Sequence, residues 1–423
     1  MIRYLLILLL IVTASVAAED FVVRKIEITG NYHTKDWVIR RELLFEAGDR
    51  IQAEDLDAAR KRLLNLQIFN NVFVTQDDAG NVTVEISEQF HYVPTLGLTS
   101  TDGRTQDAFK SVDDFFNIMT ATVGAADLNH QGNGGFVEAS ARFGATDGFT
   151  LYYSTRWLSR RLPVQFNLGM YTLLVSDKHA SVQDTSRRLR DQRVFTTIGT
   201  RRGAKVQLGA ELMFQRITRK NPLPAQRQEY EAYWASPFMI LDRRDLEWYP
   251  SRGVYAKVLG SVVSGDIPFV RSQYTIAHYI PLNQQRRTPV IAMRFAGATS
   301  TSSTPDWAHY YFGFSDLLRG YSAVKSEAAT FMLGDLELRI PFTPEVTYDV
   351  PLLGRWGHDI PFWLGLVIFG ERAELQLNGS REELWAGGVG VDVRVPFVQI
   401  IEMSWGINRD GKSDIMFQTG LKF

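Results

Sequence analysis

The chain has 423 residues, of which 45% are hydrophobic and 22% are charged, and its formal net charge is −1. This length allows more than one domain, and the balanced charge argues against a nucleic-acid-binding surface. The chain has no cysteine, which excludes disulfides, thiolate metal sites and a cysteine nucleophile.

The N-terminus has the pattern of a secretory signal peptide. Arg3 precedes an apolar run from Tyr4 to Val12, and small residues end in Ala17-Ala18 before Glu19. We expect residues 1–18 to be the signal peptide and the mature chain to be exported. The alternative is a retained membrane anchor, but the apolar run is shorter than the roughly 18 residues that a membrane-spanning helix needs.

Residues 19–90 are expected to form a small α+β domain. Alternation in "VRKIEITG" predicts a strand that ends at Gly30, after which Thr34 is expected to cap a helix and Gly48 to separate it from a second helix. Two alternating strands then flank a hairpin turn, Asp77 to Asn81, in which Gly80 adopts a positive φ. The predicted order is β-α-α-β-β. The apolar positions expected on the helices are Trp37, Val38, Leu44 and Phe45, followed by Leu56, Ala59, Leu63 and Leu66.

Residues 91–423 change to alternating segments of about ten residues, rich in glycine and aromatic residues. In "QIIEMSWGIN", for example, Ile401 and Met403 face one way and Glu402 and Ser404 the other. This pattern predicts about sixteen strands, an even number as bacterial outer-membrane barrels require. Their expected positions are near residues 91, 117, 135, 149, 163, 192, 204, 232, 253, 271, 288, 330, 363, 385, 399 and 414.

Alternation alone also fits a soluble β protein. Three features favour a transmembrane barrel: glycines and charges on the second face suit a wet lumen, aromatic residues gather at strand ends, and the last strand carries Leu421 and Phe423 as a C-terminal signal. A closed barrel also removes exposed strand edges.

The alternation also predicts which connections lie on each side of the membrane. With residues 19–90 in the periplasm, residues 176–191 and 299–329 form long extracellular loops. Connections such as Arg202-Gly203 and Pro396 to Val398 are short periplasmic turns, whereas Pro341 to Phe362 is long for one.

Four stretches resemble the BamA/TamA superfamily, in which periplasmic POTRA domains precede a sixteen-stranded barrel of the bacterial surface antigen type. "IEITGNYHTKDWVIRREL" is similar to the opening of a POTRA domain, "LRGYS" to a loop motif of arginine, glycine and an aromatic residue, and "LGDLELRIPF" to the strand that follows. "LDRRDLEWYPSRG" is similar to a periplasmic turn motif of the family. Its matching positions are Asp242, Arg244, Asp245, Pro250 and Gly253.

The resemblance implies a role for Arg319. In the family the long loop folds back into the lumen, and its arginine meets acidic side chains on the wall. Alternation in "DLELRI" agrees, because it points Glu337 inward as the expected partner of Arg319. Gly320 would allow a tight turn and Tyr321 would pack the loop tip, while Glu371 is the acidic residue that the next strand offers. The alternative is an arginine exposed to solvent.

Other patterns are weaker. The residue types of a hydrolase site are present in His278, Ser272 and Asp266. The sequence has no nucleophile elbow and no paired-histidine metal spacing, so this interpretation is weak. We therefore expect no enzyme activity, cofactor or metal. The basic stretch Ser186 to Arg190 is expected in an extracellular loop, either solvated or in contact with lipopolysaccharide phosphates.

The resemblance implies a protein that assists insertion of β-barrel proteins into the bacterial outer membrane, by strand templating at the POTRA edge and at the barrel seam. One alternative is polypeptide translocation through the lumen, as in two-partner secretion. A second is a passive pore or structural protein. The partners implied are outer-membrane lipid and lipopolysaccharide, unfolded outer-membrane or secreted clients, and periplasmic chaperones. This chain has a single POTRA pattern, whereas assembly factors typically have several.

Overall fold

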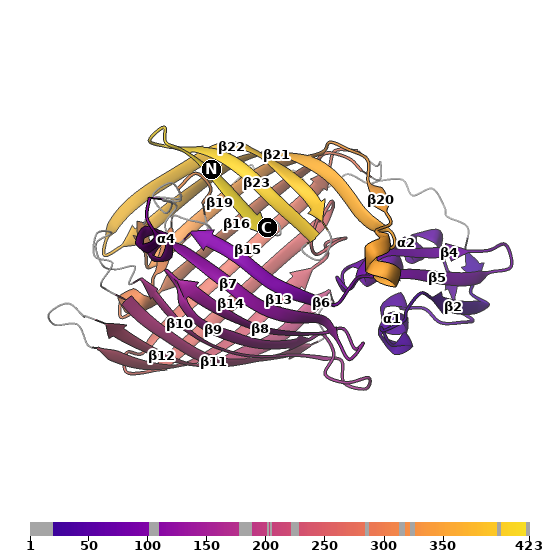
Figure 1. The fold of residues 1–423 in the computed structure, drawn as a ribbon, viewed down its shortest axis with the longest axis horizontal. Helices are drawn as coiled ribbons and strands as arrows, with labels where there is room; N and C mark the ends of the chain where they lie inside the picture. The colour runs from indigo at the N-terminus through magenta and orange to yellow at the C-terminus, as the bar shows by residue number, and fades with distance from the viewer. Residues whose placement is uncertain are drawn as a thin grey trace, which may run out of the picture.

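A computed structural model shows a small N-terminal α+β domain attached to one end of a large β-barrel (Figure 1). We call the barrel end that contacts this domain the near mouth and the opposite end the far mouth. The structure describes residues 20–100, 110–176, 188–200, 203, 205–220, 228–283, 287–312, 318–321, 326–395 and 399–419.

The N-terminal domain has the predicted β-α-α-β-β order, with one added strand pair. Its three-stranded sheet has the order β2-β5-β4, in which β2 and β5 are parallel and β4 and β5 form the predicted hairpin. The short strands β1 and β3 pair separately. The elements are β1 (Phe21–Val22), β2 (Lys25–Thr29), α1 (Asp36–Leu43), β3 (Arg50–Ile51), α2 (Ala53–Leu64), β4 (Phe69–Gln76) and β5 (Asn81–Glu88).

The core of this domain lies between the sheet and the helices. Alternate residues of β5 and one face of each helix are fully buried, as Val84, Val38 and Leu63 illustrate. Gly80 adopts φ +82° in the hairpin turn, as expected for a conformation that favours glycine.

Two details of the helix prediction are wrong. Thr34 does not cap α1: Lys35 is the N-cap residue, and the backbone N–H of Thr34 donates instead to the Glu88 carboxylate at 2.6 Å. Leu44 does not lie on the buried face, because α1 ends at Leu43. Leu44 follows in a left-handed conformation (φ +61°) with its side chain 65% exposed.

The barrel is closed and contains sixteen long antiparallel strands, which confirms the predicted fold class. Strand β6 closes the ring by lying next to β24. The strands are β6 (Tyr92–Ser100), β7 (Met119–His130), β8 (Gly135–Gly144), β9 (Asp147–Thr155), β10 (Val164–Ser176), β11 (Arg188–Thr200), β12 (Val206–Lys220), β13 (Glu229–Asp242), β14 (Gly253–Gly265), β15 (Phe269–Pro281), β16 (Val290–Ser300), β19 (Thr330–Pro341), β21 (Ile360–Leu377), β22 (Ser380–Val395), β23 (Gln399–Asn408) and β24 (Ser413–Thr419).

Side chains alternate between the lumen and the outer surface, as the period of two requires. In β19, Leu336 is 53% exposed on the outside whereas Asp335 and Glu337 are buried inside. The outer faces are mostly aliphatic or aromatic, which suits contact with lipid. No helix among the described residues is both long and apolar enough to cross a membrane.

The connections contain short elements. The far-mouth connection between β16 and β19 contains the 3₁₀ helix η1 and the paired strands β17 and β18, and the near-mouth connection between β19 and β21 contains strand β20 and the 3₁₀ helix η2. Helix α4 lies before β7. Their bounds are α4 (Val112–Ile118), η1 (Asp306–Ala308), β17 (Tyr310–Phe312), β18 (Ser326–Ala328), β20 (Val346–Tyr348) and η2 (Pro351–Trp356).

Several expectations fall outside the described residues: the signal peptide 1–18, Leu421 and Phe423, residues 186–187, Arg202, and Pro396 to Val398. The expected loop location of Arg188 and Arg190 is wrong, because both belong to β11. Arg188 donates to Asp147 at 3.1 Å and to the carbonyl of Ala145 at 2.9 Å. These bonds fix the guanidinium against the barrel wall.

We predict that residues 19–90 fold alone and that Leu63→Ala destabilises this fragment by about 2–5 kcal/mol, because it leaves a cavity in a fully buried site. Leu44→Ala is the control: its side chain is 65% exposed, so the change should be within about 0.5 kcal/mol. Urea unfolding followed by circular dichroism measures both. A random-coil spectrum of the unmodified fragment would show that the domain does not fold independently.

Candidate functional site

The candidate site is a buried cluster of charges inside the barrel, centred on Arg319. Its guanidinium donates to three carboxylates: Nη2 to Glu337 at 2.5 Å, Nη1 to Glu402 at 2.8 Å, and Nε to Glu371. The backbone N–H of Arg319 also donates to Glu371, at 2.7 Å. Each of the four side chains is at most 1% exposed. Arg319 is therefore not a solvated loop residue.

The three carboxylates come from three strands, and the alternation of side chains along each strand points them into the lumen. Glu337 lies on β19, Glu371 on β21 and Glu402 on β23, and each occupies an inward position of its strand. Phe369, two residues before Glu371, places its ring 3.7 Å from the Arg319 guanidinium carbon, which adds a cation–π contact. The sequence indicated Glu337 as the partner of Arg319 and offered Glu371 only as a nearby acid, without predicting a second contact. It did not single out Glu402, although alternation had placed it on the inner face.

The residues after Arg319 hold the loop tip against β22 and β23. Gly320 adopts φ +81°, and a Cβ there would lie 3.4 Å from the Cβ of Ala386, so the tip packs closely against the wall. Tyr321 is buried, and its hydroxyl donates to the carbonyl of Trp385 at 2.9 Å. Asn408 donates to the carbonyl of Gly320 at 2.9 Å. The tip is thus fixed through charge, backbone and packing together.

Arg339 extends the cluster towards the near mouth. Its Nε and Nη2 donate to Glu337 at 2.8 and 2.7 Å, so this carboxylate is shared between two arginines. The guanidinium also lies over the rings of Tyr249 and Tyr279, with its carbon 5.8 and 5.6 Å from the ring centroids. A buried carboxylate needs such compensation for its lost hydration.

The connection that carries Arg319 has a second anchor, on strands β12 and β15. Arg219 of β12, which is 1% exposed, donates to Asp306 of η1 at 2.6 Å. Arg271 of β15 stacks over the rings of Trp234 and Tyr310 and donates to the carbonyl of Ala308 at 3.3 Å. The described parts of this connection therefore contact two separate sets of barrel strands.

The turn motif of residues 242–253 lies at the near mouth, between β13 and β14. Arg244 donates to both oxygens of Asp242, at 2.9 and 2.6 Å. Asp245 closes the turn by accepting from the backbone N–H and hydroxyl of Ser251. Pro250 is buried, and Gly253 has φ +113° where a Cβ would lie 2.1 Å from the carbonyl oxygen of Arg243. The motif gives this turn one defined conformation.

The turn also attaches the N-terminal domain to the barrel. Arg156, after β9, donates to both oxygens of Glu247 at 3.0 Å and also to the carbonyl of Asn65. Asn65 in turn accepts from the backbone N–H of Glu247 at 2.8 Å, and Leu246 packs against the domain core. Burial opposes the charge of Arg156, but the Glu247 carboxylate outweighs it and raises the pKa of Arg156 above its ordinary value. No pattern in the sequence indicated this contact.

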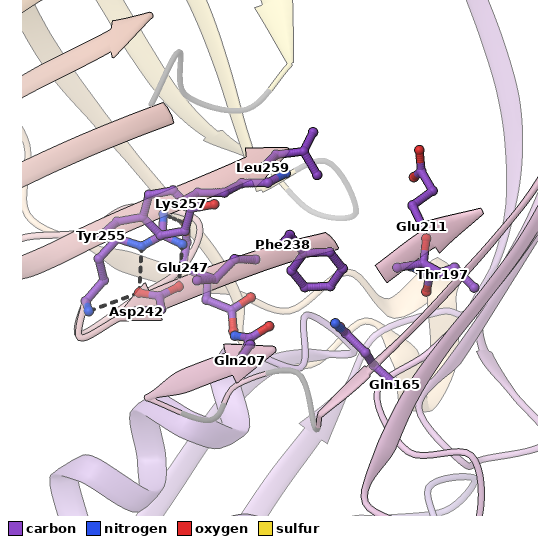
Figure 2. A pocket seen from close by; sticks show the side chains of 13 residues that line it. Gln165, Thr197, Gln207, Glu211, Phe238, Asp242, Glu247, Tyr255, Lys257 and Leu259 are labelled. Atoms are coloured by element: carbon purple, nitrogen blue, oxygen red, sulfur yellow. Dashed lines mark hydrogen bonds and ion pairs between the residues drawn. The ribbon is translucent and has the colours of Figure 1, made fainter. Parts of the chain in front are cut away.

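A polar cavity of about 320 Å³ lies along the inner wall formed by β10 to β14 (Figure 2). Figure 2 shows Gln165, Glu211 and Lys257 on different strands around it. It is lined mainly by polar and charged groups, whereas the wall from β16 to β23 carries the Arg319 cluster. The lumen therefore has an open polar space beside β10 to β14 and packed side chains beside the strands of the Arg319 cluster.

We found no arrangement typical of catalysis in the described part of the chain. No group of three or more histidine, aspartate or glutamate side chains there is placed to hold a metal ion. Ser272 and His278 lie on one strand, six residues and therefore roughly 20 Å apart, too far for a nucleophile and its base.

Comparison with known proteins gives a consistent family. Residues 21–89 match the POTRA family model, described as a surface antigen variable number repeat, and residues 129–423 match the Omp85 superfamily domain. The chain is 23% identical over 365 residues to outer membrane protein assembly factor BamA of Neorickettsia risticii (strain Illinois), covering 79% of this chain and 46% of that protein. It thus spans about half the length of that curated relative.

Two solved structures share the fold. BamA from Haemophilus ducreyi lacking POTRA domains 1–3 matches with a TM-score of 0.55 and 15% identity, over 95% of this chain and 84% of that one. CdiB from Acinetobacter baumannii matches with a TM-score of 0.55 and 9% identity, over 93% and 72%. The superfamily match covers more than half of the sequence and includes the strands that hold the Arg319 cluster. This protein belongs to the Omp85 superfamily.

Proposed function

We propose that this protein resides in the bacterial outer membrane, with its POTRA domain in the periplasm, and assists insertion of β-barrel proteins. A client strand would pair at the seam between β6 and β24, because exposed backbone groups template strand addition. The relative from Neorickettsia risticii is named an outer membrane protein assembly factor, which supports the assembly role.

The observation that carries this proposal is the character of the seam. Pro94 within β6 has no N–H to donate. Leu96 of β6 and Phe417 of β24 are 73% and 71% exposed, more than any other large hydrophobic residue of the described barrel strands. Neighbouring side chains therefore cover the outer surface less on both sides of this junction than elsewhere, which favours opening there.

The POTRA domain offers a first docking point for clients. In the sheet order β2-β5-β4, strands β2 and β4 are the edges, so each has one side that pairs with no strand of that sheet. An unfolded polypeptide would add to such an edge through main-chain hydrogen bonds.

A second candidate is translocation of a polypeptide through the lumen. The polar cavity along β10 to β14 supports it, because an unfolded chain needs a hydrophilic path. In this function the loop that carries Arg319 would act as a gate, and both its anchors, Arg319 and Asp306, would have to release.

Assembly requires the seam between β6 and β24 to open, whereas translocation through the lumen does not. We predict that a disulfide between β6 and β24 abolishes acceleration of client folding, because a client strand cannot enter a covalently closed junction. Cysteine pairs are screened across the two strands in this cysteine-free chain. The measurement is the folding rate of a urea-unfolded outer-membrane barrel in vesicles that contain the protein, before and after reduction.

The control disulfide joins the facing residues Leu168 and Thr196 of β10 and β11, away from the seam. It should leave client folding unchanged. If the seam disulfide is also without effect on client folding, assembly by strand addition at the seam is wrong.

We predict that Arg319→Ala releases the loop. The substitution leaves three buried carboxylates without their shared cation, which costs about 3–5 kcal/mol and corresponds to a roughly 100-fold or greater rise in protease cleavage within residues 299–329. Arg372→Ala is the control, because Arg372 adjoins Glu371 on β21 but its side chain is 71% exposed. Equal cleavage of Arg319→Ala and the unmodified protein would show that Arg319 does not hold the loop.

We predict a smaller effect for Gly320→Ala. At φ +81° an alanine costs about 1–2 kcal/mol, so cleavage should rise by roughly ten-fold while the Arg319 contacts stay available. Gly379→Ala, in the far-mouth turn between β21 and β22, is a matched control, because Gly379 has φ +82° and open space around it. If both variants are cleaved alike, the packing of the loop tip contributes nothing to closure.

A further inference from the structure

The near-mouth connection between β19 and β21 has apolar side chains that the described chain leaves largely exposed. Even-numbered positions from Phe342 to Leu352 carry apolar side chains, and the odd-numbered positions from Thr343 to Asp349 carry polar ones. The exposed fractions are 76% for Phe342, 38% for Val346, 56% for Tyr348, 37% for Val350 and 94% for Leu352. We call these five side chains the rim face.

The rim face continues the lipid-facing surface of the barrel. Outward residues of β19 run through Met332 and Leu336, and Phe342 follows in the same even-numbered series. Ten residues of a tilted strand rise about 25 Å along the barrel axis, which is the height of the apolar band of an outer-membrane barrel. With Met332 inside the band, Phe342 therefore lies near its POTRA-side edge.

The positions of residues along β21 independently place this connection at the same depth in the membrane. The charged residue Arg372 is exposed on its outer face near the far mouth, and Phe362 lies ten residues closer to the near mouth. Val346 pairs with Phe362, and Tyr348 pairs with Ile360, two residues or about 5 Å further along. Tyr348 is thus at the depth where tyrosine is enriched in membrane proteins, the boundary between acyl chains and headgroups.

This connection also contacts the POTRA domain. Asn70 donates to the carbonyls of Trp356 and His358, both at 3.0 Å, and Ser87 donates to Asp359. The ring of Trp356 also packs against His91 at 5.6 Å. Figure 1 shows β20 and η2 between the barrel and the POTRA domain. The connection therefore has one set of groups bound to protein and another set left apolar and bare.

We propose that the rim face is a lipid-binding surface, which inserts Tyr348 and Leu352 into the membrane leaflet on the POTRA side. Leu352 is 94% exposed, so the described residues cover little of its side chain, and it gains its stabilisation from contact with acyl chains. Because the same connection binds the POTRA domain, insertion holds that domain at a fixed height below the membrane. This explains why a turn on the POTRA side is so long.

The test places an environment-sensitive thiol probe on single-cysteine variants of the full-length protein, which has no native cysteine. Leu352→Cys and Tyr348→Cys probe the rim face, Leu336→Cys is the reference within the lipid-facing band, and Asp78→Cys in the exposed POTRA hairpin is the aqueous reference. Each is reconstituted in vesicles of dioleoylphosphatidylcholine and of its analogue brominated in the acyl chains. All four positions are exposed or half-exposed, so the substitutions leave the core intact.

The Leu352 and Tyr348 probes should lose fluorescence in brominated vesicles by roughly two-fold, as for a group about 5–10 Å inside the interface. The Leu336 probe should be quenched at least as strongly, and the Asp78 probe should not change. The proposal is wrong if the fluorescence of the Leu352 probe is unchanged in brominated vesicles and is quenched by aqueous iodide, like that of the Asp78 probe. The rim face would then be a surface for another protein and not for lipid.

Discussion

The buried contact between Arg319 and three glutamates determines how the barrel interior is organised. Glu337, Glu371 and Glu402 come from three strands, and inside the barrel their hydration is replaced by one guanidinium and by Arg339. A wall with three such carboxylates is unfavourable without a cation, since removing a charge from water costs several kcal/mol. The loop is therefore the counterion of the wall as well as an obstruction in the lumen. Arginine suits this role better than lysine, because its planar fork donates to several carboxylates at once.

Alternation in the sequence predicted the strands, because burial of every second residue leaves a period of two in each strand. The barrel was predicted only with the polar, glycine-rich second face and the aromatic residues at strand ends. Alternation also pointed Glu337 inward, and the structure brings that residue to Arg319. The same pattern did not indicate which inward acids meet, because that depends on the neighbours and stagger of the strands around the ring. Glu402 lies 83 positions from Arg319, and only the closed barrel brings them together.

The contacts at the near mouth were beyond sequence reasoning for a different physical reason. Asn65, Arg156 and Glu247 are polar residues in turns, where no periodicity distinguishes a buried partner from a solvated one. Thr34 illustrates the same limit. It has the side chain of a good helix cap, but Glu88 takes its backbone N–H, and its hydroxyl accepts a hydrogen bond from Asn129. Tertiary contacts with the barrel thus overrode a local preference.

A continuous series of contacts joins the POTRA domain to the loop. Leu246 packs on the POTRA core, Tyr249 of the same turn lies against Arg339, and Arg339 shares Glu337 with Arg319. All of these contacts beyond the turn lie on the wall from β19 to β23, and β23, which carries Glu402, is the immediate neighbour of seam strand β24. A displacement of β24 therefore acts first on the strand that holds one of the three carboxylates. The opposite wall, from β10 to β14, has no part in this cluster and lines the polar cavity. One side of the seam, β24, and the loop are thus both bound to β23, through main-chain pairing and through Glu402 respectively.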